Sequence, residues 1–380
     1  MNKPKLIFVV TEDWYFLSHR LPTVRGAQAA GYDVAVITNA GQARAAIEQA
    51  GVRVIPFDFA RRSLNPVQAF GQILRLRKLY ALEKPQVIHH IAMKPILFGS
   101  LAACMTPVPH IVNAFAGLGY VFTSDTMKAR SIRTVLVLMF RMLLQRPANI
   151  TLFQNDDDRI LLEKLGALRT GKSKTALIRG SGVDIDQYRV DPLPERGDFI
   201  CVFAGRMIGI KGLPTLKEAF DILKQEAPHI KLWLCGQPDP GNPGSWTQSE
   251  IDQWCLENPN VIHKGHCRMD EIWPQTHIAL QPSYGGEGIP KSLLEAAACG
   301  RAIIATDVPG CREMVRDAVN GALVPAYDAK ALAAAILKIE QDRDICRRMG
   351  QESRAMVEGD LSAAAVMEKA RLLYAGFLKH

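Results

Sequence analysis

The chain has 380 residues, 48% of them hydrophobic and 22% charged, which are ordinary values for a globular protein with room for two domains. Its formal net charge of +8 favours a phosphate-rich partner such as a nucleotide, a nucleic acid or an anionic lipid surface. Eight scattered cysteines without a CxxC pair exclude a disulfide framework or a zinc site of the usual spacing. The chain shows no signal-peptide pattern and no apolar run of about 18 residues, so we expect a cytoplasmic protein with reduced thiols and no membrane span.

Short apolar runs alternate with amphipathic stretches over roughly the first 180 residues. The runs predict buried strands over residues 6–10, 33–38, 52–57, 87–91, 110–113, 150–153 and 176–178. The stretches between them predict helices over 21–30, 43–49, 67–82, 95–104 and 131–145. Strands that alternate with helices form βαβ units, so we expect a parallel sheet covered on both faces.

A polar segment over 189–197 with two prolines and no periodicity is interpreted as a linker. The alternation then resumes, with strands expected over 200–204, 231–234, 261–264, 278–281, 302–305 and 322–324, and helices over 213–225, 291–298, 312–315, 329–340 and 363–378. The pattern predicts two doubly wound Rossmann-like α/β domains, 1–190 and 198–362, with the C-terminal helix, 363–380, as a candidate to pack back on the first. We expect ligands in a cleft between the carboxyl ends of the two sheets.

The strongest local signal follows the strand predicted at 278–281, where a glycine-rich turn leads into a helix. Pro290 suits the first turn of that helix. Backbone N–H groups over 288–291 and the helix dipole together favour an anion at this end. Two carboxylates, Glu287 in the loop and Glu295 in the helix, flank the turn.

A second signal, from Gly205 to Gly212, follows the first strand of the second domain and contains Arg206 and Lys211. The two cations can converge on the same anion. A diphosphate leaving group gains negative charge as its bond to a sugar breaks, so fixed positive charges stabilise the transition state more than the ground state.

These segments resemble the family 4 retaining glycosyltransferases of GT-B architecture. Glu287 and Glu295 match the E-x7-E motif of that family, and Gly205 to Gly212 match its G-R-x4-K-G motif. Further matching segments over 113–120, 153–158 and 182–188 occur in the family's order, so the resemblance spans nearly the whole chain. The chain departs from the family at Ala116, where many members carry a histidine, and in the loop at 11–15, which lacks the usual glycine-rich turn.

The resemblance implies a donor site in the second domain and transfer without a bound metal or cofactor. Arg206 and Lys211 would hold the donor diphosphate, Glu287 the hydroxyls of the donor sugar and Glu295 those of the ribose. The phosphate site would be completed by Gly205, Gly288, Ile289, Pro290 and Lys291. Catalysis is assigned to Glu287, Arg206 and Lys211, and retention to attack by the acceptor on the face that the diphosphate leaves.

The first domain is expected to bind the acceptor, a glycan or a saccharide linked to a polyprenyl diphosphate, with candidates His19, Arg20, His90, Lys94 and Gly117. A capping or surface role remains open for His19 and Arg20. Residues 127–146 carry five cations, no acid and an apolar run too short to span a bilayer. We interpret this segment as an interfacial helix on an anionic membrane, with a core helix with basic ends as the alternative. The donor base is expected to be uridine rather than guanosine, in the synthesis of surface polysaccharide or O-antigen.

Alternative functions share parts of this pattern. A nucleotide-sugar epimerase of the same architecture and a non-catalytic nucleotide-sugar binder both remain open. The absence of GxGxxG after residues 6–10 or 200–204 disfavours a nicotinamide dehydrogenase, and no nucleic-acid-binding module is recognisable. Asp184 and Asp186 spell a DxD motif, which binds a metal and a nucleotide in the other glycosyltransferase architecture.

Overall fold

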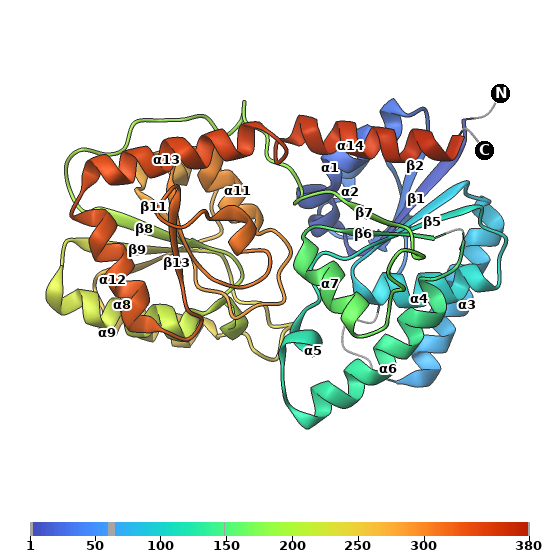
Figure 1. Ribbon diagram of the computed structural model, residues 1–380, viewed down its shortest axis with the longest axis horizontal. Coiled ribbons are helices and arrows are strands. Elements are labelled where there is room, and N and C mark those ends of the chain that lie inside the picture. Colours follow the sequence, from blue (N-terminus) through green and yellow to red (C-terminus); the bar gives the residue numbers. More distant parts are fainter. Residues whose placement is uncertain (1–2, 60–64, 148, 379–380) are drawn as a thin grey trace. The chain divides into compact units, whose positions relative to one another are not determined.

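The computed structural model describes residues 3–59, 65–147 and 149–378. The chain forms two compact units, which are described in turn (Figure 1). Unit 1 comprises Met1–Gly182 and Ala364–His380, and unit 2 comprises Val183–Ala363.

Unit 1 is built on a seven-stranded parallel sheet with the order β3-β2-β1-β4-β5-β6-β7. Its strands are β1 (Lys5–Glu12), β2 (Asp33–Asn39), β3 (Arg53–Pro56), β4 (Val87–Ile91), β5 (His110–Ala114), β6 (Asn149–Phe153) and β7 (Thr175–Leu177). The strand order reverses between β1 and β4. In doubly wound folds, ligands bind at the carboxyl edge of the sheet at such a reversal.

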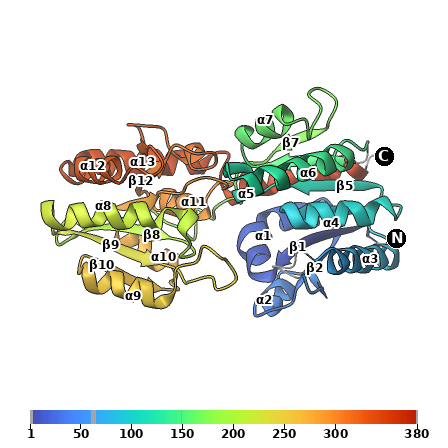
Figure 2. The same cartoon turned by 90° about the horizontal axis from the view of Figure 1, so that it is seen from below.

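The helices of unit 1 cover both faces of its sheet (Figures 1 and 2). They are α1 (Asp13–Ala29), α2 (Arg44–Gln49), α3 (Pro66–Glu83), α4 (Met93–Cys104), α5 (Tyr120–Thr123), α6 (Met127–Leu143), α7 (Asp156–Lys164) and α14 (Ala363–Ala375). Alternate residues of β1 enter different cores: Leu6 and Phe8 join one, Ile7 and Val9 the other. The apolar run of β1 is therefore continuous because each face of the sheet is buried.

The C-terminal helix α14 packs into the core of unit 1. The Tyr374 hydroxyl lies 2.7 Å from Nδ1 of His89 in β4, and the Tyr32 hydroxyl donates to the Tyr374 carbonyl over 3.1 Å. Tyr374 is fully buried in the same cluster as Phe8. The last helix of the chain thus completes a core that the first strand begins.

Unit 2 contains a six-stranded parallel sheet with the order β10-β9-β8-β11-β12-β13, which reverses between β8 and β11. Its strands are β8 (Phe199–Ala204), β9 (Ile230–Cys235), β10 (Val261–Gly265), β11 (Ile278–Gln281), β12 (Ala302–Thr306) and β13 (Gly321–Val324). Its α-helices are α8 (Leu213–Glu226), α9 (Gln248–Glu257), α10 (Met269–Ile272), α11 (Lys291–Ala298), α12 (Ala329–Glu340) and α13 (Arg343–Glu358). The prediction of two parallel-sheet α/β domains is confirmed.

The segment predicted to be a linker, 189–197, belongs to unit 2, and so do the residues from Val183 onward. Arg354 of α13 donates to the carbonyls of Ile185 and Tyr188. The fully buried Arg301 donates to the Asp191 carbonyl over 3.0 Å. These two guanidinium groups therefore attach residues 185–191 to the rest of unit 2. Such contacts cannot be predicted from the periodicity of the sequence.

Three helices of unit 2, α9, α10 and α13, were not predicted from the pattern of apolar residues, and the helix predicted over 312–315 is a single 3-10 turn, Arg312–Met314. The N-terminus of α9 nevertheless has a local signal, a capping box formed by Thr247 and Glu250. In unit 1, the short α5 and the polar α7 were also missed.

Candidate functional site

The donor site predicted from the sequence lies at the carboxyl edge of the unit 2 sheet, where its strand order reverses. β8 and β11 are neighbours in the sheet, and the two predicted motifs are the loops that leave these two strands. Lys211 ends a 3-10 turn, Gly209–Lys211, directly before α8. Glu287 lies in the loop between β11 and α11. The reversal therefore brings together residues that are 76 positions apart in the chain.

Two glycines allow these loops to approach other backbone closely. A Cβ atom at Gly212 would lie 1.9 Å from the Pro282 carbonyl oxygen, and one at Gly310 would lie 2.0 Å from that of Gly288. Both glycines also have positive φ angles, 84° and 83°, which residues with side chains rarely adopt. The glycines thus hold the β8 and β12 loops against the β11 loop, and a methyl group at either position would separate them.

Lys211 and Glu287 form the central ion pair of the site. The Lys211 Nζ lies 2.5 Å from Oε1 and 2.7 Å from Oε2 of Glu287, and both side chains are about 85% buried, with exposures of 16% and 15%. The Ser283 hydroxyl donates to Oε1 of the same carboxylate over 3.2 Å. Mostly buried charges must be paired, and this pair keeps one cation and one hydrogen-bond acceptor at the carboxyl edge.

The second glutamate of the motif lies one helix turn further on, in α11. Glu295 is only 7% exposed, and its Oε1 lies 3.4 Å from the Lys291 Nζ. Burial raises the pKa of Glu295, while Lys291 and a hydrogen bond from Tyr188 act in the opposite direction. Tyr188 is therefore a further residue of this site. The sequence contains it only as the last residue of the 182–188 segment, and nothing local indicates that it reaches α11.

Arg206 is placed differently from Lys211. It is 45% exposed on its side chain and donates to Oδ2 of Asp239 over 2.7 Å. Asp239 is held in turn by a hydrogen bond from its own backbone N–H to the Ser245 hydroxyl, over 2.8 Å. Asp239 lies in the loop after β9 and was not predicted, because a single aspartate in a polar loop carries no sequence signal. The loop after β9 is thus a third segment of the site.

The α11 terminus supplies the positive end of a helix dipole at the same edge. α11 begins at Lys291 with Pro290 as its N-cap residue, one position earlier than the first-turn position expected for this proline. Gly288 and Ile289 are buried directly before it. A helix N-terminus of this kind favours a phosphate group. Side chains and backbone of the predicted donor site, from Gly205 to Glu295, therefore share one edge of one sheet.

The candidates for acceptor binding lie in unit 1, close to its own strand reversal. His19 and Arg20 belong to α1, which directly follows β1. The His19 ring stacks on Tyr15 at 4.3 Å, and Arg20, only 3% exposed, donates to the Tyr15 hydroxyl over 3.1 Å. Lys94 in α4 and Gly117, with a φ of 103°, follow β4 and β5. Of these five residues, His19, Lys94 and Gly117 are partly exposed.

His90 is not on an accessible surface, which corrects the expectation that it contacts an acceptor. It is fully buried, with one ring nitrogen 2.8 Å from Asn113 Oδ1 and the other 3.0 Å from the Tyr80 hydroxyl. Burial lowers its pKa to about 4, so the ring is neutral at physiological pH. His90 lies within β4, all five residues of which are buried, and the sequence did not distinguish a position inside this strand from one at its carboxyl edge.

The DxD sequence at 184–186 forms a turn. The Asp184 Oδ1 accepts hydrogen bonds from the backbone N–H groups of Asp186 and Gln187, over 3.0 and 3.1 Å. Within the described parts of the chain, no three His, Cys, Asp or Glu side chains are grouped so that they could hold a metal ion. These hydrogen bonds give Asp184 a structural role in the turn.

The two units share their fold with solved GT-B proteins. Over 99% of both chains, the structure superposes on HepE from Anabaena in complex with UDP and glucose with a TM-score of 0.79 and 17% identity. It superposes on sucrose-phosphate synthase from Thermosynechococcus elongatus with a TM-score of 0.80 and 19% identity, again over 99% of both chains. The fold and the edge site therefore define a protein of the GT-B class.

Two family models cover the chain in succession. Residues 5–155 match the glycosyl transferase 4-like model, and residues 184–356 match the model of glycosyl transferases group 1. The chain therefore belongs to the family 4 type of glycosyltransferases and is an enzyme. The comparisons give no support to the epimerase alternative.

Two bacterial glycosyltransferases are similar to this chain over most of its length. One is the N,N'-diacetylbacillosaminyl-diphospho-undecaprenol alpha-1,3-N-acetylgalactosaminyltransferase of Campylobacter jejuni, 26% identical over 87% of this chain and 90% of the relative. Another is the capsular polysaccharide biosynthesis glycosyltransferase CapM of Staphylococcus aureus, 24% identical over 100% of this chain and 99% of the relative.

Proposed function

We propose that this glycosyltransferase moves a sugar from a UDP-sugar to a saccharide carried on a polyprenyl diphosphate, with retention of the anomeric configuration, in the synthesis of a surface polysaccharide. The observation that carries the proposal is the paired Lys211 and Glu287 at the strand reversal of unit 2. The activity of the Campylobacter relative, which acts on an undecaprenol-linked acceptor, supports the class of acceptor. The UDP of the HepE complex supports the donor base.

In the proposed reaction, unit 2 binds the donor and unit 1 binds the acceptor. Lys211, Arg206 and the α11 terminus neutralise the diphosphate. Glu287 accepts hydrogen bonds from the donor sugar, and Glu295 from the ribose. Because the Glu287 carboxylate already holds Lys211, one residue orients both the sugar and the cation next to the bond that breaks. Each charge-assisted contact contributes about 1.5–3 kcal/mol.

The bond changes follow from this arrangement. The bond between the anomeric carbon and the β-phosphate oxygen breaks, and its electron pair leaves with UDP. The acceptor hydroxyl oxygen attacks the same face of the anomeric carbon, and its proton passes to the departing phosphate oxygen. Because the leaving diphosphate gains charge during this step, Lys211 and Arg206 stabilise the transition state more than the bound donor.

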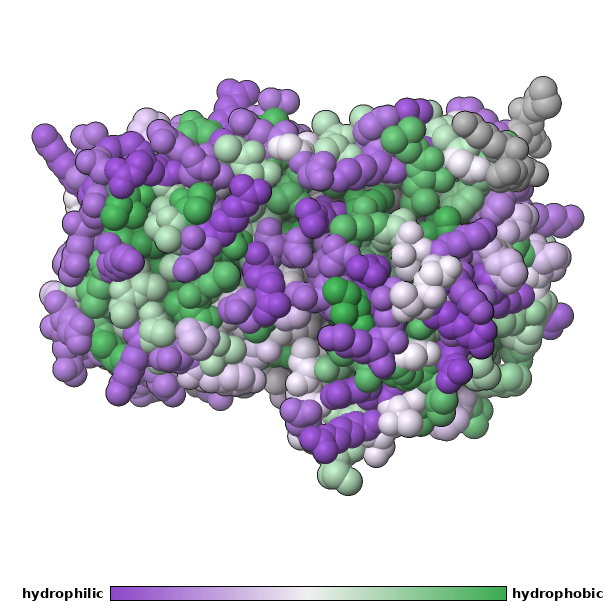
Figure 3. Space-filling model, viewed as in Figure 1, coloured by the Kyte–Doolittle hydropathy of each residue, from purple (hydrophilic) through white to green (hydrophobic). Residues whose placement is uncertain are grey.

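The acceptor lipid requires contact with a membrane, and α6 has the features of an interfacial helix. One side of α6 is buried through Ala129, Phe140 and Leu143. The other side exposes Val135, Leu138 and Met142 by 56%, 55% and 70%. Hydrophilic and hydrophobic side chains lie next to each other over this helix (Figure 3). Exposed apolar side chains beside cations suit the boundary between acyl chains and anionic headgroups.

No helix among the described residues is long and apolar enough to cross a bilayer. Peripheral binding through α6, at the inner face of the cell membrane, is therefore the mode of membrane contact that we propose. Part of its basic surface is used within the protein, since Arg133 donates to the carbonyls of Val121 and Ser124. Lys128, Arg130 and Arg141 are exposed, and Arg130 is paired with Asp125 over 3.7 Å, which leaves Lys128 and Arg141 on the helix for lipid phosphates.

The test is a transfer assay with a panel of UDP- and GDP-sugars and a polyprenyl-diphosphate-linked saccharide, with products identified by mass spectrometry. We expect transfer from at least one UDP-sugar, and a loss of turnover of at least about tenfold in Lys211→Ala. Lys338→Ala, which removes an exposed lysine of α12, is the matched control and should retain activity. Wild-type turnover by Lys211→Ala would contradict the assigned diphosphate role, and transfer from GDP-sugars alone would contradict uridine.

A further inference from the structure

A hollow of about 420 Å³ lies in unit 2, and none of its lining residues belongs to the candidate donor site. It is lined by Lys217 of α8, by Trp246 in the loop before α9, and by one face of α9 with Ser249, Gln253, Trp254 and Glu257. The remaining lining residue, Glu250, is engaged in the capping box of α9. The volume falls within the range of about 300–1,000 Å³ that is usual for small-molecule sites.

Two tryptophans form the apolar part of this hollow. Their ring centroids lie 5.7 Å apart with an angle of 62° between the rings. Trp254 is 1% exposed, so it is part of the core, whereas Trp246 is only partly buried. An aromatic ring offers an apolar surface for the C–H face of a saccharide ring and also attracts cations.

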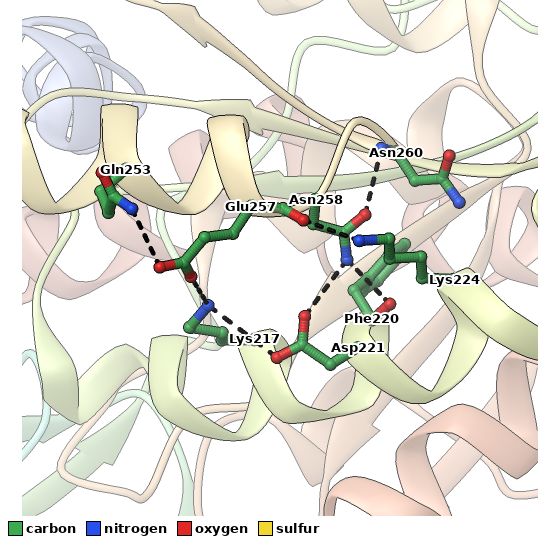
Figure 4. A network of polar contacts seen from close by, with 8 residues as sticks. All are labelled: Lys217, Phe220, Asp221, Lys224, Gln253, Glu257, Asn258 and Asn260. Atoms are coloured by element: carbon green, nitrogen blue, oxygen red, sulfur yellow. Dashed lines mark hydrogen bonds and ion pairs between the residues drawn. The ribbon is translucent and has the colours of Figure 1, made fainter.

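The polar part of the hollow is a network between α8 and α9 (Figure 4). Glu257 Oε2 accepts a hydrogen bond from Lys217 Nζ over 2.8 Å, and Oε1 accepts one from Gln253 Nε2 over 3.1 Å. Lys224 donates to the Glu257 carbonyl, which fixes the end of α9 to α8. Donors and acceptors are thus held in place on both sides of the hollow.

The charges favour a neutral ligand over a cation. Lys217 Nζ lies 6.0 Å from the centroid of the Trp254 ring and 3.8 Å from Asp221 Oδ2, so it occupies the position that a ligand cation would take over this ring. A second cation would meet the Lys217 charge at close range. A neutral polyol meets no such repulsion, and its hydroxyls can both donate to Glu257 and accept from Gln253 or Lys217.

We propose that this hollow, formed between α8 and α9, is a second binding site for a neutral saccharide. Its tryptophan surface fits the apolar face of a sugar ring, and its carboxylate, amide and ammonium groups fit the hydroxyls at the edge of that ring. The ligand is a saccharide unit, either free or within an oligosaccharide.

The hollow also shares a loop with the donor site. The Trp246 backbone N–H donates to the Met207 carbonyl over 2.8 Å, and the Gly209 N–H donates to the Gly244 carbonyl over 2.7 Å. The same loop contains Asp239, the partner of Arg206. A saccharide stacked on Trp246 therefore contacts one end of this loop, and Asp239, which holds Arg206, lies near the other end.

The experiment measures saturation-transfer NMR of the full-length protein, saturated with UDP, with glucose, galactose, N-acetylglucosamine, maltotriose and chitotriose as separate probes. We expect at least one probe to bind with a dissociation constant in the millimolar range. Gln253→Ala should weaken that binding about fivefold, the factor that corresponds to one neutral hydrogen bond. Gln248→Ala is the matched control, because Gln248 is a glutamine of the same helix that does not line the hollow.

Further variants separate this site from the donor site. Trp246→Ala should abolish the signal while the thermal unfolding transition is retained, and Lys211→Ala should leave saccharide affinity unchanged. A stronger signal for the trisaccharides than for the monosaccharides would identify an oligosaccharide as the ligand, and equal signals a free sugar. The proposal is overturned if no probe binds, if both glutamine variants lose affinity equally, if Lys211→Ala removes the signal, or if choline displaces the saccharide.

Discussion

The two strand reversals of this protein are similar in topology and opposite in chemistry. At the carboxyl edge of unit 2, Lys211 and Glu287 form an ion pair, and their side chains are 16% and 15% exposed. Near the reversal of unit 1, His89 and His90 of β4 are fully buried and bonded to Tyr374, Tyr80 and Asn113. Unit 2 presents charges at its reversal, whereas β4 of unit 1 uses its polar side chains within the core.

The difference indicates how each unit meets its ligand in the proposed reaction. A diphosphate carries fixed negative charges, so a few cations and a helix terminus at one sheet edge can bind it. The hydroxyls of an acceptor saccharide are uncharged, and their recognition requires several weaker contacts from different loops. Changes in unit 2 should therefore act mainly on catalysis, and changes in the core of unit 1 mainly on stability.

The largest effect is expected for Glu287→Gln. The amide keeps the size of the side chain but loses the charge that holds Lys211, so kcat/KM should fall by about 100- to 1,000-fold. The free energy of unfolding and the affinity for UDP should change much less. Steady-state kinetics and chemical denaturation of the same samples separate the two effects. Near-wild-type turnover would show that the ion pair is structural.

Asp158→Asn tests the buried charge of unit 1. Burial raises the pKa of Asp158 to about 7, whereas the unfolded carboxyl group titrates near 3.9. Between these pH values the native state binds more protons than the unfolded state. The free energy of unfolding therefore falls as the pH rises from about 4 to 7, by roughly 4 kcal/mol in total. The variant should be more stable than the wild type at pH 8, and the gain should vanish near pH 4. Urea denaturation across this range measures it.

Gly99→Ala should destabilise unit 1 without affecting the donor site. A Cβ atom at Gly99 would lie 2.2 Å from Nε2 of the buried His90 ring. Such overpacking costs about 1–3 kcal/mol. Gly71→Ala is the control, because this glycine of α3 has open space around its Cβ position and alanine favours the helix. Thermal unfolding should separate the variants, and equal UDP affinity by calorimetry is expected. A change in UDP affinity in Gly99→Ala would contradict the division between the units.

Leu138→Glu should have the smallest effect and only in the presence of lipid. A charge on the exposed apolar side of α6 should lower binding to vesicles of anionic phospholipid about tenfold, because one leucine side chain fewer is buried in the lipid interface. Leu82→Glu alters a 74% exposed leucine of α3 and serves as the control. Cosedimentation measures both. Equal loss in the two variants, or none, would argue against α6 as the membrane contact.

The strands of both sheets were predictable, but several helices were not. Parallel strands are buried on both faces and form continuous apolar runs, so each predicted strand lies within about two residues of the observed one. The missed helix α13 is polar on average, and its buried side combines Cys346, Met349 and Val357 with Gly350 and Ser353. A Cβ atom at its Gly350 would lie 2.0 Å from the Gly300 carbonyl oxygen. The helical spacing is therefore present in the sequence, but Gly350 and Ser353 interrupt its apolar signal and charged residues surround it.

The sequence by itself determined the fold class, and it was sufficient to predict the residues after β8 and β11 that we propose as the donor site. Each of these features depends on residues that are close together in the chain, and the glycines and charges carry the signal at fixed spacing. Only the tertiary structure decided that Tyr188 reaches Glu295, that Asp239 holds Arg206 and that His90 is buried. These contacts join segments that are far apart in the sequence, and nothing in one segment indicates the partner that folding brings to it.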